Sequence, residues 1–353
     1  MNKIPQSIID RYPNLVVEGL NIKVYSSMDE EYNALKKGVV IRDVSGKGVV
    51  KLAGEEAFDF IHRLSTNDIK DIKENERRNT IFTNDKGRFI DRVTVFRFRD
   101  HALLVGGVDK GALLSAWLDR YIIMEDLSVF DLTEHYSVFE IIGPQSESYL
   151  TALLGRAVDM IDNKRFIHLN FERINVIIAK IEVKENMFRY TLVVPADEHD
   201  NFLELLLNNN SIFDVKMCGE NAYDLFRIEN NIPGDTGELI DKFNPHEAGL
   251  INEVSFSKGC YIGQEVIARL DTYDKVQKKL VRVKSGVIFN NLPAQLVDSE
   301  GNDAGFLTSL AKTSFNGAFP GLAYVRNKFI ENGAKLYIDD EAEILIEICE
   351  KKV

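Results

Sequence analysis

The order of the predicted strands and helices constrains the fold of this chain more than any other feature of its sequence. Up to about residue 273, strands and amphipathic helices alternate irregularly, without the regular βαβ order of a parallel sheet. This order is typical of antiparallel sheets covered by helices. From residue 278 onward we expect only short strands, at 280–284, 286–289, 294–297, 305–310, 321–326, 334–338 and 342–349. Because Asn-, Gly- and Pro-containing turns separate them, these strands predict a small barrel or sandwich.

The length of 353 residues is too great for one ordinary domain, so two or three are expected. A polar segment at 274–279 has the composition of a linker. We therefore predict an α+β first lobe over residues 1–126, an α+β second lobe over 127–275 and a C-terminal β-barrel over 276–353. The complete chain is predicted to be an α+β protein.

The composition excludes several classes of protein. A net charge of −12 argues against general binding to nucleic acid or to an anionic membrane. Cys218, Cys260 and Cys349 lie far apart, which fits neither a disulfide framework nor a zinc site. The six histidines are scattered, so no metal ligand is assigned, and no nucleotide-phosphate loop is found. The chain also lacks a signal-like apolar start and any apolar run of ~20 residues, so it is predicted to be cytoplasmic, without a membrane span.

The segment 258–265 is the densest group of reactive side chains in the sequence, with the residues Lys-Gly-Cys-Tyr-Ile-Gly-Gln-Glu. Apolar spacing after it predicts a helix over 263–273, with Glu265 in the first turn, where the helix dipole favours an anion. Gly259 and Gly263 suggest a backbone that turns sharply or approaches another segment closely.

Cys260 lies just before this predicted helix and two residues after Lys258. A helix N-terminus and a neighbouring cation both make a thiolate more available. The alternative is that Cys260 is a small buried hydrophobic residue, as free cysteines often are. The residues themselves indicate a functional loop and leave its chemistry open.

Two loops contain the same tripeptide, Thr-Asn-Asp, at 66–68 and 83–85. Asn and Asp are turn formers that bond to their own backbone, so both loops can be simple turns. The second loop lies in a predicted hairpin, with strands at 80–83 and 89–98 and a turn at 85–87.

The segment 258–265 resembles the KGCYxGQE signature of YgfZ-type folate-binding proteins, which are relatives of the glycine-cleavage T-protein (aminomethyltransferase). All seven fixed positions match. Further segments resemble T-protein motifs in the same order along the chain, over roughly residues 30–330. These segments are Thr66-Asn67-Asp68, Gly87-Arg88-Phe89-Ile90-Asp91-Arg92, Gly143-Pro144, Arg227-Ile228-Glu229, Pro245-His246-Glu247-Ala248-Gly249-Leu250 and Ala323-Tyr324-Val325-Arg326.

This resemblance implies a three-lobed, cloverleaf-like fold with a tetrahydrofolate site. By similarity, Glu229 accepts hydrogen bonds from the pterin ring, since two carboxylate oxygens match two N–H donors. Asn67, Asp68 and Asp91 are placed near the reactive end of the folate. Tyr261 and Arg269 are assigned, on the same resemblance, to folate binding.

The chain departs from T-proteins at three places. Their GGIxDD segment has two acids, whereas this chain has Asp91-Arg92. Their GYTGExGFE loop is not recognisable, and the corresponding stretch is 189–194, Arg-Tyr-Thr-Leu-Val-Val. T-proteins also lack the cysteine of KGCYxGQE. These departures favour the YgfZ-type group, which is associated with tetrahydrofolate-dependent assembly or repair of iron–sulfur enzymes.

The resulting hypothesis is a protein that binds tetrahydrofolate or a one-carbon derivative and assists iron–sulfur client or assembly proteins. Cys260, Lys258 and Asp91 are its candidate catalytic residues. The alternative is a folate-dependent aminomethyltransferase or demethylase. A third possibility is an interaction module that has lost its folate site.

Overall fold

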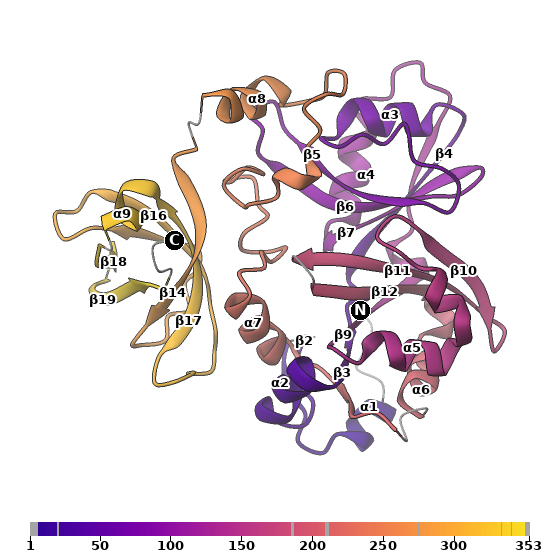
Figure 1. Cartoon of the computed structure of the whole chain (residues 1–353), viewed down its shortest axis with the longest axis horizontal. Helices are drawn as coiled ribbons and strands as arrows, with labels where there is room; N and C mark the ends of the chain where they lie inside the picture. Colours follow the sequence, from indigo (N-terminus) through magenta and orange to yellow (C-terminus); the bar gives the residue numbers. More distant parts are fainter. Residues whose placement is uncertain are drawn as a thin grey trace. The chain divides into compact units, whose positions relative to one another are not determined.

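The structure is a computed structural model that describes residues 6–19, 21–184, 187–208, 212–273, 276–332, 334–339 and 341–349. The chain divides into two compact units (Figure 1). Unit 1 comprises Met1–Ile61, Ile69–Asn79 and Val93–Tyr223, and unit 2 comprises His62–Asp68, Thr80–Arg92 and Asp224–Val353. The predicted linker residues Asp274 and Lys275 lie outside the described residues, and the division into 1–126, 127–275 and 276–353 stays a prediction.

A six-stranded sheet of order β10-β11-β12-β9-β3-β13 forms the centre of unit 1. Its strands are β3 (Val39–Asp43), β9 (Tyr136–Ile142), β10 (Phe166–Phe171), β11 (Ile174–Lys184), β12 (Met187–Pro195) and β13 (Val215–Met217). Neighbouring strands pair antiparallel, except that β13 pairs parallel with β3. Helices α5 (Ser146–Leu154) and α6 (His199–Asn208) supply side chains to one face of this sheet.

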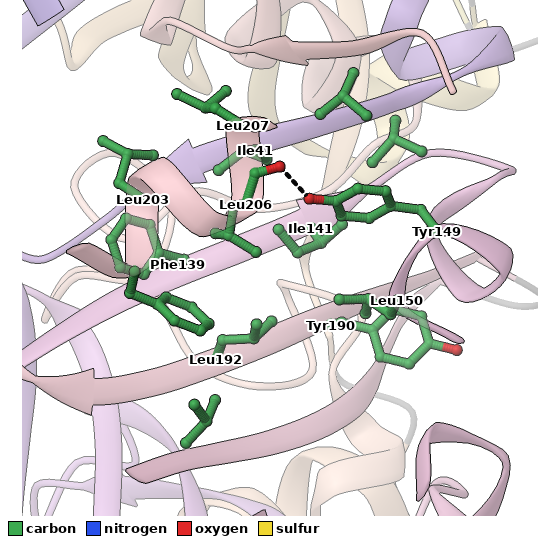
Figure 2. Packing of buried hydrophobic residues seen from close by; sticks show 14 of the residues in the cluster. Ile41, Phe139, Ile141, Tyr149, Leu150, Tyr190, Leu192, Leu203, Leu206 and Leu207 are labelled. Carbon is green, nitrogen blue, oxygen red and sulfur yellow. Dashed lines mark hydrogen bonds between the residues drawn. The ribbon is translucent and has the colours of Figure 1, made fainter. Parts of the chain in front are cut away.

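The main core of unit 1 lies on that face (Figure 2). Successive strand residues point to opposite faces, so Phe139 and Ile141 enter this core while Glu140, between them, faces the other way. Leu203 and Leu206 of α6 pack against the same face. Full burial of one such side chain contributes about 1.5–3 kcal/mol, so this core accounts for a large part of the stability of unit 1.

A second sheet has the order β5-β6-β7-β4-β8. Its strands are β4 (Lys47–Ala53), β5 (Arg77–Thr83), β6 (Phe89–Arg97), β7 (His101–Val108) and β8 (Ser128–Asp131). The predicted hairpin is confirmed as β5, a turn, and β6. The predicted turn chemistry is also confirmed, because Asn84 Oδ1 accepts the backbone N–H groups of Lys86 and Arg88, each at 3.0 Å.

Smaller elements complete the N-terminal and middle parts of the chain. They are α1 (Gln6–Arg11), β1 (Val16–Glu18), β2 (Asn21–Val24), α2 (Met28–Lys37), α3 (Ala57–Leu64), α4 (Gly111–Asp119), α7 (Glu220–Glu229) and α8 (Gln264–Thr272).

The C-terminal part of unit 2 is a closed barrel of order β14-β17-β16-β15-β18-β19. Its elements are β14 (Lys278–Ser285), β15 (Ala294–Val297), β16 (Asp303–Leu310), β17 (Phe319–Arg326), α9 (Asn327–Asn332), β18 (Leu336–Ile338) and β19 (Glu341–Ile348). The predicted strand over 286–289 is wrong. The hydroxyl of Ser285 accepts the N–H of Val287 and donates to its carbonyl oxygen, so a local turn ends β14 there. The α+β class with antiparallel sheets and a C-terminal barrel is confirmed.

His199, at the start of α6, lies between two carboxylates. Its Nε2 is 2.9 Å from Asp43 Oδ2, and its Nδ1 is 2.7 Å from Asp200 Oδ1. Burial disfavours the charged imidazole, but the two carboxylates outweigh it and raise the pKa of His199 from 6.5 to about 9. Because the folded-state pKa is raised, the stabilisation is fully present below pH 6.5 and is lost as the pH rises through 9.

We expect His199→Gln to destabilise the protein by on the order of 2 kcal/mol at pH 6, because the charged imidazole is lost. The difference from wild type should shrink toward zero by about pH 10, where His199 is neutral. Denaturant unfolding at both pH values measures this, with exposed His168→Gln as the control. An equal His199→Gln effect at both pH values would contradict the assignment.

Candidate functional site

The segment 258–265 forms a loop that leads into α8, as the sequence predicted. Gly263 is the N-cap residue and has a φ of +82°. A Cβ at this position would lie 2.6 Å from the carbonyl oxygen of Asn84, so the loop meets the β5–β6 turn with no room for a side chain. Gly259, by contrast, has open space around it. The prediction of close backbone approach is thus confirmed for Gly263 alone.

Lys258 fixes the first Thr-Asn-Asp loop. Its ammonium group donates to the backbone carbonyls of His62, Ser65 and Asn67, the last two at 2.6 and 2.8 Å. Three donors are all that an ammonium group has. Burial lowers the pKa of Lys258 from 10.5 to about 8, and the nearby charge of Asp68 opposes the shift. Lys258 therefore remains mostly protonated at neutral pH, and its ammonium group holds three backbone carbonyls in place.

Arg92 is the residue that the sequence resemblance matches with the second acid of the T-protein motif. Its guanidinium forms a two-point ion pair with buried Glu253, with distances of 2.8 Å from Nε to Oε2 and 2.5 Å from Nη2 to Oε1. Thr66 extends this contact, because its hydroxyl donates to the carbonyl oxygen of Glu253 at 2.8 Å. Asp91 is 1% exposed and accepts the N–H of Arg92 at 2.9 Å. Arg92 thus has a local structural partner in Glu253.

A further contact joins the hairpin to the segment 258–265, because the hydroxyl of Thr83 donates to the carbonyl oxygen of Ile262 at 2.6 Å. Together with Lys258 and Arg92, it links three stretches of unit 2, namely 62–68, 80–92 and 253–265. We call these three stretches the clamped group. It contains six of the predicted site residues directly: Asn67, Asp68, Asp91, Lys258, Cys260 and Tyr261.

Cys260 and Tyr261 differ sharply in their environments. Cys260 is a free, exposed thiol, so the alternative of a buried hydrophobic cysteine is wrong. Tyr261 is only 7% exposed, and its hydroxyl has no hydrogen-bond partner among the described residues. Burial raises the pKa of Tyr261 to about 12, so the hydroxyl keeps its proton at neutral pH. A buried, unsatisfied hydroxyl is costly, and a bound ligand is one way to satisfy it.

Glu229 is the last residue of α7 and is partly buried. Its carbonyl oxygen accepts from Arg282 Nη1 at 3.0 Å. Two residues earlier, Arg227 contacts buried Glu238 at 3.0 Å and Ser309 at 2.8 Å. The end of α7 is therefore held against β14 and β16 of the barrel. Predicted folate residue Arg269 lies on α8 with its side chain exposed.

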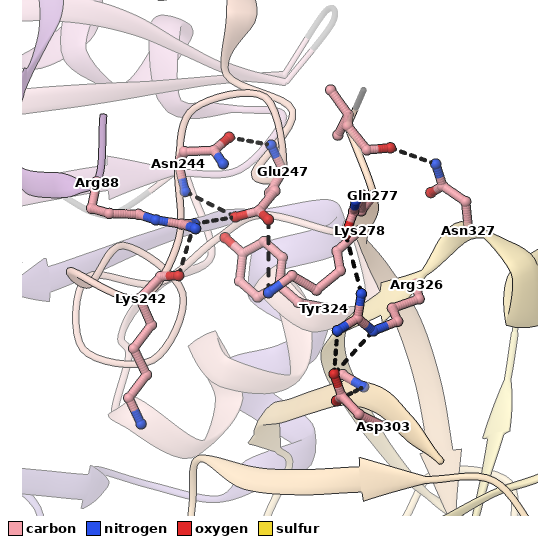
Figure 3. A network of polar contacts seen from close by, with 12 residues as sticks. Arg88, Lys242, Asn244, Glu247, Gln277, Lys278, Asp303, Tyr324, Arg326 and Asn327 are labelled. Atoms are coloured by element: carbon pink, nitrogen blue, oxygen red, sulfur yellow. Dashed lines mark hydrogen bonds and ion pairs between the residues drawn. The ribbon is translucent and has the colours of Figure 1, made fainter. Parts of the chain in front are cut away.

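The run 245–250 is anchored by Glu247 (Figure 3). The Glu247 carboxylate pairs with Arg88 of the hairpin turn at 2.9 Å and with Lys278 of β14 at 3.7 Å. His246 contacts the carbonyl oxygen of Ile267 in α8 at 2.9 Å. This polar, Pro- and Gly-containing loop therefore positions the hairpin, α8 and the barrel edge within unit 2.

The sequence analysis missed Glu253 and Thr83 as parts of this arrangement. Both make their contacts with residues far away in the chain. Glu253 belongs to no recognisable short motif, and Thr83 begins the second Thr-Asn-Asp tripeptide, which was interpreted only as a turn. A buried Glu paired with the unexpected Arg92 is visible only in three dimensions.

Among the described residues there is no helix long and apolar enough to cross a membrane. The same part of the chain holds no group of three or more His, Cys, Asp or Glu side chains arranged to bind a metal ion.

The fold of this chain is that of the aminomethyltransferase T protein. The chain is similar to the crystal structure of glycine cleavage system aminomethyltransferase T from Bartonella henselae, with a TM-score of 0.81 and 16% sequence identity over 99% of this chain and 97% of the other. The GCVT N-terminal domain family matches residues 10–258. The chain belongs to this family.

Curated relatives match most of the chain at low sequence identity. A chloroplastic candidate transferase of Arabidopsis thaliana is 26% identical over 91% of this chain and 73% of the relative. An aminomethyltransferase of Thermoanaerobacter pseudethanolicus is 25% identical over 89% of this chain and 85% of the relative. Since one relative is described as chloroplastic, the cytoplasmic location of this protein stays a prediction.

We expect Gly263→Ala to destabilise the protein by about 1–3 kcal/mol, because alanine is strained at a positive φ and its Cβ meets the Asn84 backbone. The matched variant is Gly259→Ala, in the same loop but with open space, which should change stability by less than about 0.5 kcal/mol. Denaturant unfolding of both variants measures the difference. Equal effects would contradict the close approach of the loop to the hairpin turn.

Proposed function

We propose that the protein binds tetrahydrofolate, or a one-carbon derivative of it, through the clamped group and Glu229. The observation that carries the proposal is the buried Tyr261 hydroxyl, which has no described partner and lies within the segment that resembles a folate-binding signature. The shared fold and family membership support it.

The residues fit the chemistry of a pterin, which offers several N–H donors and acceptors in one plane. In the proposed arrangement, the carboxylate of Glu229 accepts from the aminopyrimidine edge and the Tyr261 hydroxyl donates to a ligand oxygen or nitrogen. Asn67 and Asp68 add polar groups on a loop that Lys258 holds rigid. Arg269, which is exposed on α8, is suited to a carboxylate at the outer end of the ligand.

The proposed role of the bound folate is of the YgfZ type, in the assembly or repair of iron–sulfur enzymes. Two observations favour it over glycine cleavage. Cys260 presents an exposed thiol within the clamped group. Arg92, where T-proteins have a second acid, is engaged with Glu253 instead. The ammonium group of Lys258 donates its hydrogen bonds to backbone carbonyls. The exposure of Cys260 and its position before a helix N-terminus therefore support the reactivity of the thiol more than Lys258 does.

Aminomethyl transfer is the second candidate. Several relatives are named aminomethyltransferases, and buried Asp91 is retained. In this reaction a methylene group moves from an aminomethyl donor to tetrahydrofolate, and the amino group leaves as ammonia. Asp91 would hold or accept the proton of the folate amine. Methylenetetrahydrofolate formed only when an aminomethyl donor is supplied, and lost in Asp91→Asn, would favour this candidate.

Calorimetric titration tests folate binding itself. We expect wild type to bind tetrahydrofolate and 5-formyltetrahydrofolate, and Tyr261→Phe to bind about tenfold more weakly because one buried hydrogen bond is lost. Glu229→Ala should lose binding. The matched control is Tyr273→Phe, an exposed tyrosine at the end of α8, which should bind as wild type does. Absence of binding by wild type would contradict the proposal.

The role of the thiol is tested by function rather than by folate affinity. We expect Cys260→Ser to keep wild-type folate affinity and stability but to lose the rescue of an iron–sulfur enzyme in cells that lack the protein. Cys349→Ser, which removes another exposed thiol, should rescue normally. Full rescue by Cys260→Ser would rule out a chemical role for Cys260.

A further inference from the structure

The sheet face opposite the main core of unit 1 holds a row of polar residues. Arg42 of β3 is paired in register with Glu140 of β9, and Glu140 with Thr191 of β12. Residues paired directly across an antiparallel sheet have neighbouring side chains. Arg189 lies two residues from Thr191 on the same strand and therefore on the same face. The row thus places two arginines on either side of one carboxylate.

Three cations surround the carboxylate of Glu140, which is completely buried. Arg42 Nη1 lies 2.5 Å from Oε2, and Arg189 Nη1 lies 3.0 Å from Oε1. Lys47 Nζ is 3.9 Å from the same Oε1. The side chains of Arg42 and Arg189 are 14% and 17% exposed, so a small part of each side chain reaches solvent. These four side chains together carry a net charge of +2.

Neighbouring groups hold the cations in place. The Arg42 guanidinium carbon lies 3.3 Å from the ring centroid of Tyr223, which fixes the plane of the guanidinium by stacking. Lys47 also donates to the carbonyl oxygen of Gly106 at 3.4 Å. The donors are therefore pre-positioned, which reduces the entropy lost on binding a ligand.

Thr191 adds an independent sign of a ligand. It is 2% exposed, and its hydroxyl has no hydrogen-bond partner among the described residues. Its side chain lies beside the Glu140 carboxylate, next to the arginines. Such a buried hydroxyl is normally satisfied by protein, water or ligand.

We propose that Arg42, Lys47, Arg189 and Thr191 form a binding site for a small oxyanion, a carboxylate or a phosphate group. Planar guanidinium groups bind both anions through paired N–H donors, and the threonine hydroxyl supplies a further donor. Glu140 spaces the two arginines and limits the affinity, because it repels an incoming anion. The site lies within unit 1 and does not depend on folate binding by unit 2.

Calorimetric titration of the full chain with sodium phosphate and, separately, sodium glutarate tests this proposal. We expect saturable binding of at least one anion by wild type. Arg189→Gln should weaken it about tenfold or more, and Thr191→Val about fivefold, whereas Thr191→Ser should retain it. Glu140→Gln should bind about tenfold or more tightly, since it removes a nearby negative charge without changing the shape.

Lys284→Gln is the control, because it removes one positive charge at an exposed ion pair of the barrel. The proposal would be overturned if Lys284→Gln weakened anion binding as much as Arg189→Gln does. It would also be overturned if neither wild type nor Glu140→Gln bound either anion saturably. Should Glu140→Gln fail to fold, the comparison of Thr191→Val with Thr191→Ser decides. Preference for phosphate or for glutarate identifies the class of ligand.

Discussion

One partly buried ammonium group, that of Lys258, holds the candidate site together. It is bonded to three backbone carbonyls of the stretch 62–68, and no shorter or neutral side chain offers three donors from one atom. Gly263 adds a steric constraint. A Cβ at residue 263 would collide with the β5–β6 turn, so the loop approaches this turn only with glycine there. The Lys-Gly-Cys-Tyr-Ile-Gly-Gln-Glu segment thus has a structural role, because it contacts the stretch 62–68 and the β5–β6 turn. These contacts position its reactive side chains.

The chain has the T-protein fold and brings an arginine together with a buried glutamate at two places. In unit 2, Arg92 pairs with buried Glu253. In unit 1, Arg189 and Arg42 both pair with buried Glu140. Removing one partner of such a buried ion pair strongly destabilises the protein, which constrains how the surrounding residues can vary.

Much of the architecture was predictable because it depends on local signals. The hairpin turn at 85–87 follows from Asn84 bonding to neighbouring backbone N–H groups, and α8 follows from apolar spacing with Glu265 in its first turn. The KGCYxGQE resemblance pointed to the fold and to Lys258. The strand expected at 286–289 failed because Ser285 forms a local turn that apolar periodicity does not reveal.

The partners of the site residues could not be predicted in this way. Glu253, Thr83 and Glu140 make their contacts with residues that are distant in sequence, so their roles depend on tertiary structure. Lys258 illustrates the limit most clearly. Its closeness to Cys260 in sequence suggested activation of the thiol, whereas the structure directs its ammonium group to backbone carbonyls.

Hydrogen exchange of the full chain, with and without tetrahydrofolate, tests most directly whether the clamped group is the folate site. The account predicts that the ligand slows exchange in 62–68, 80–92 and 253–265 and at the end of α7. Lys258→Met should speed exchange in 62–68 without ligand, whereas Lys279→Met, at an exposed position on β14, should not. Ligand protection confined to other parts of the chain, or unchanged exchange in Lys258→Met, would contradict the account.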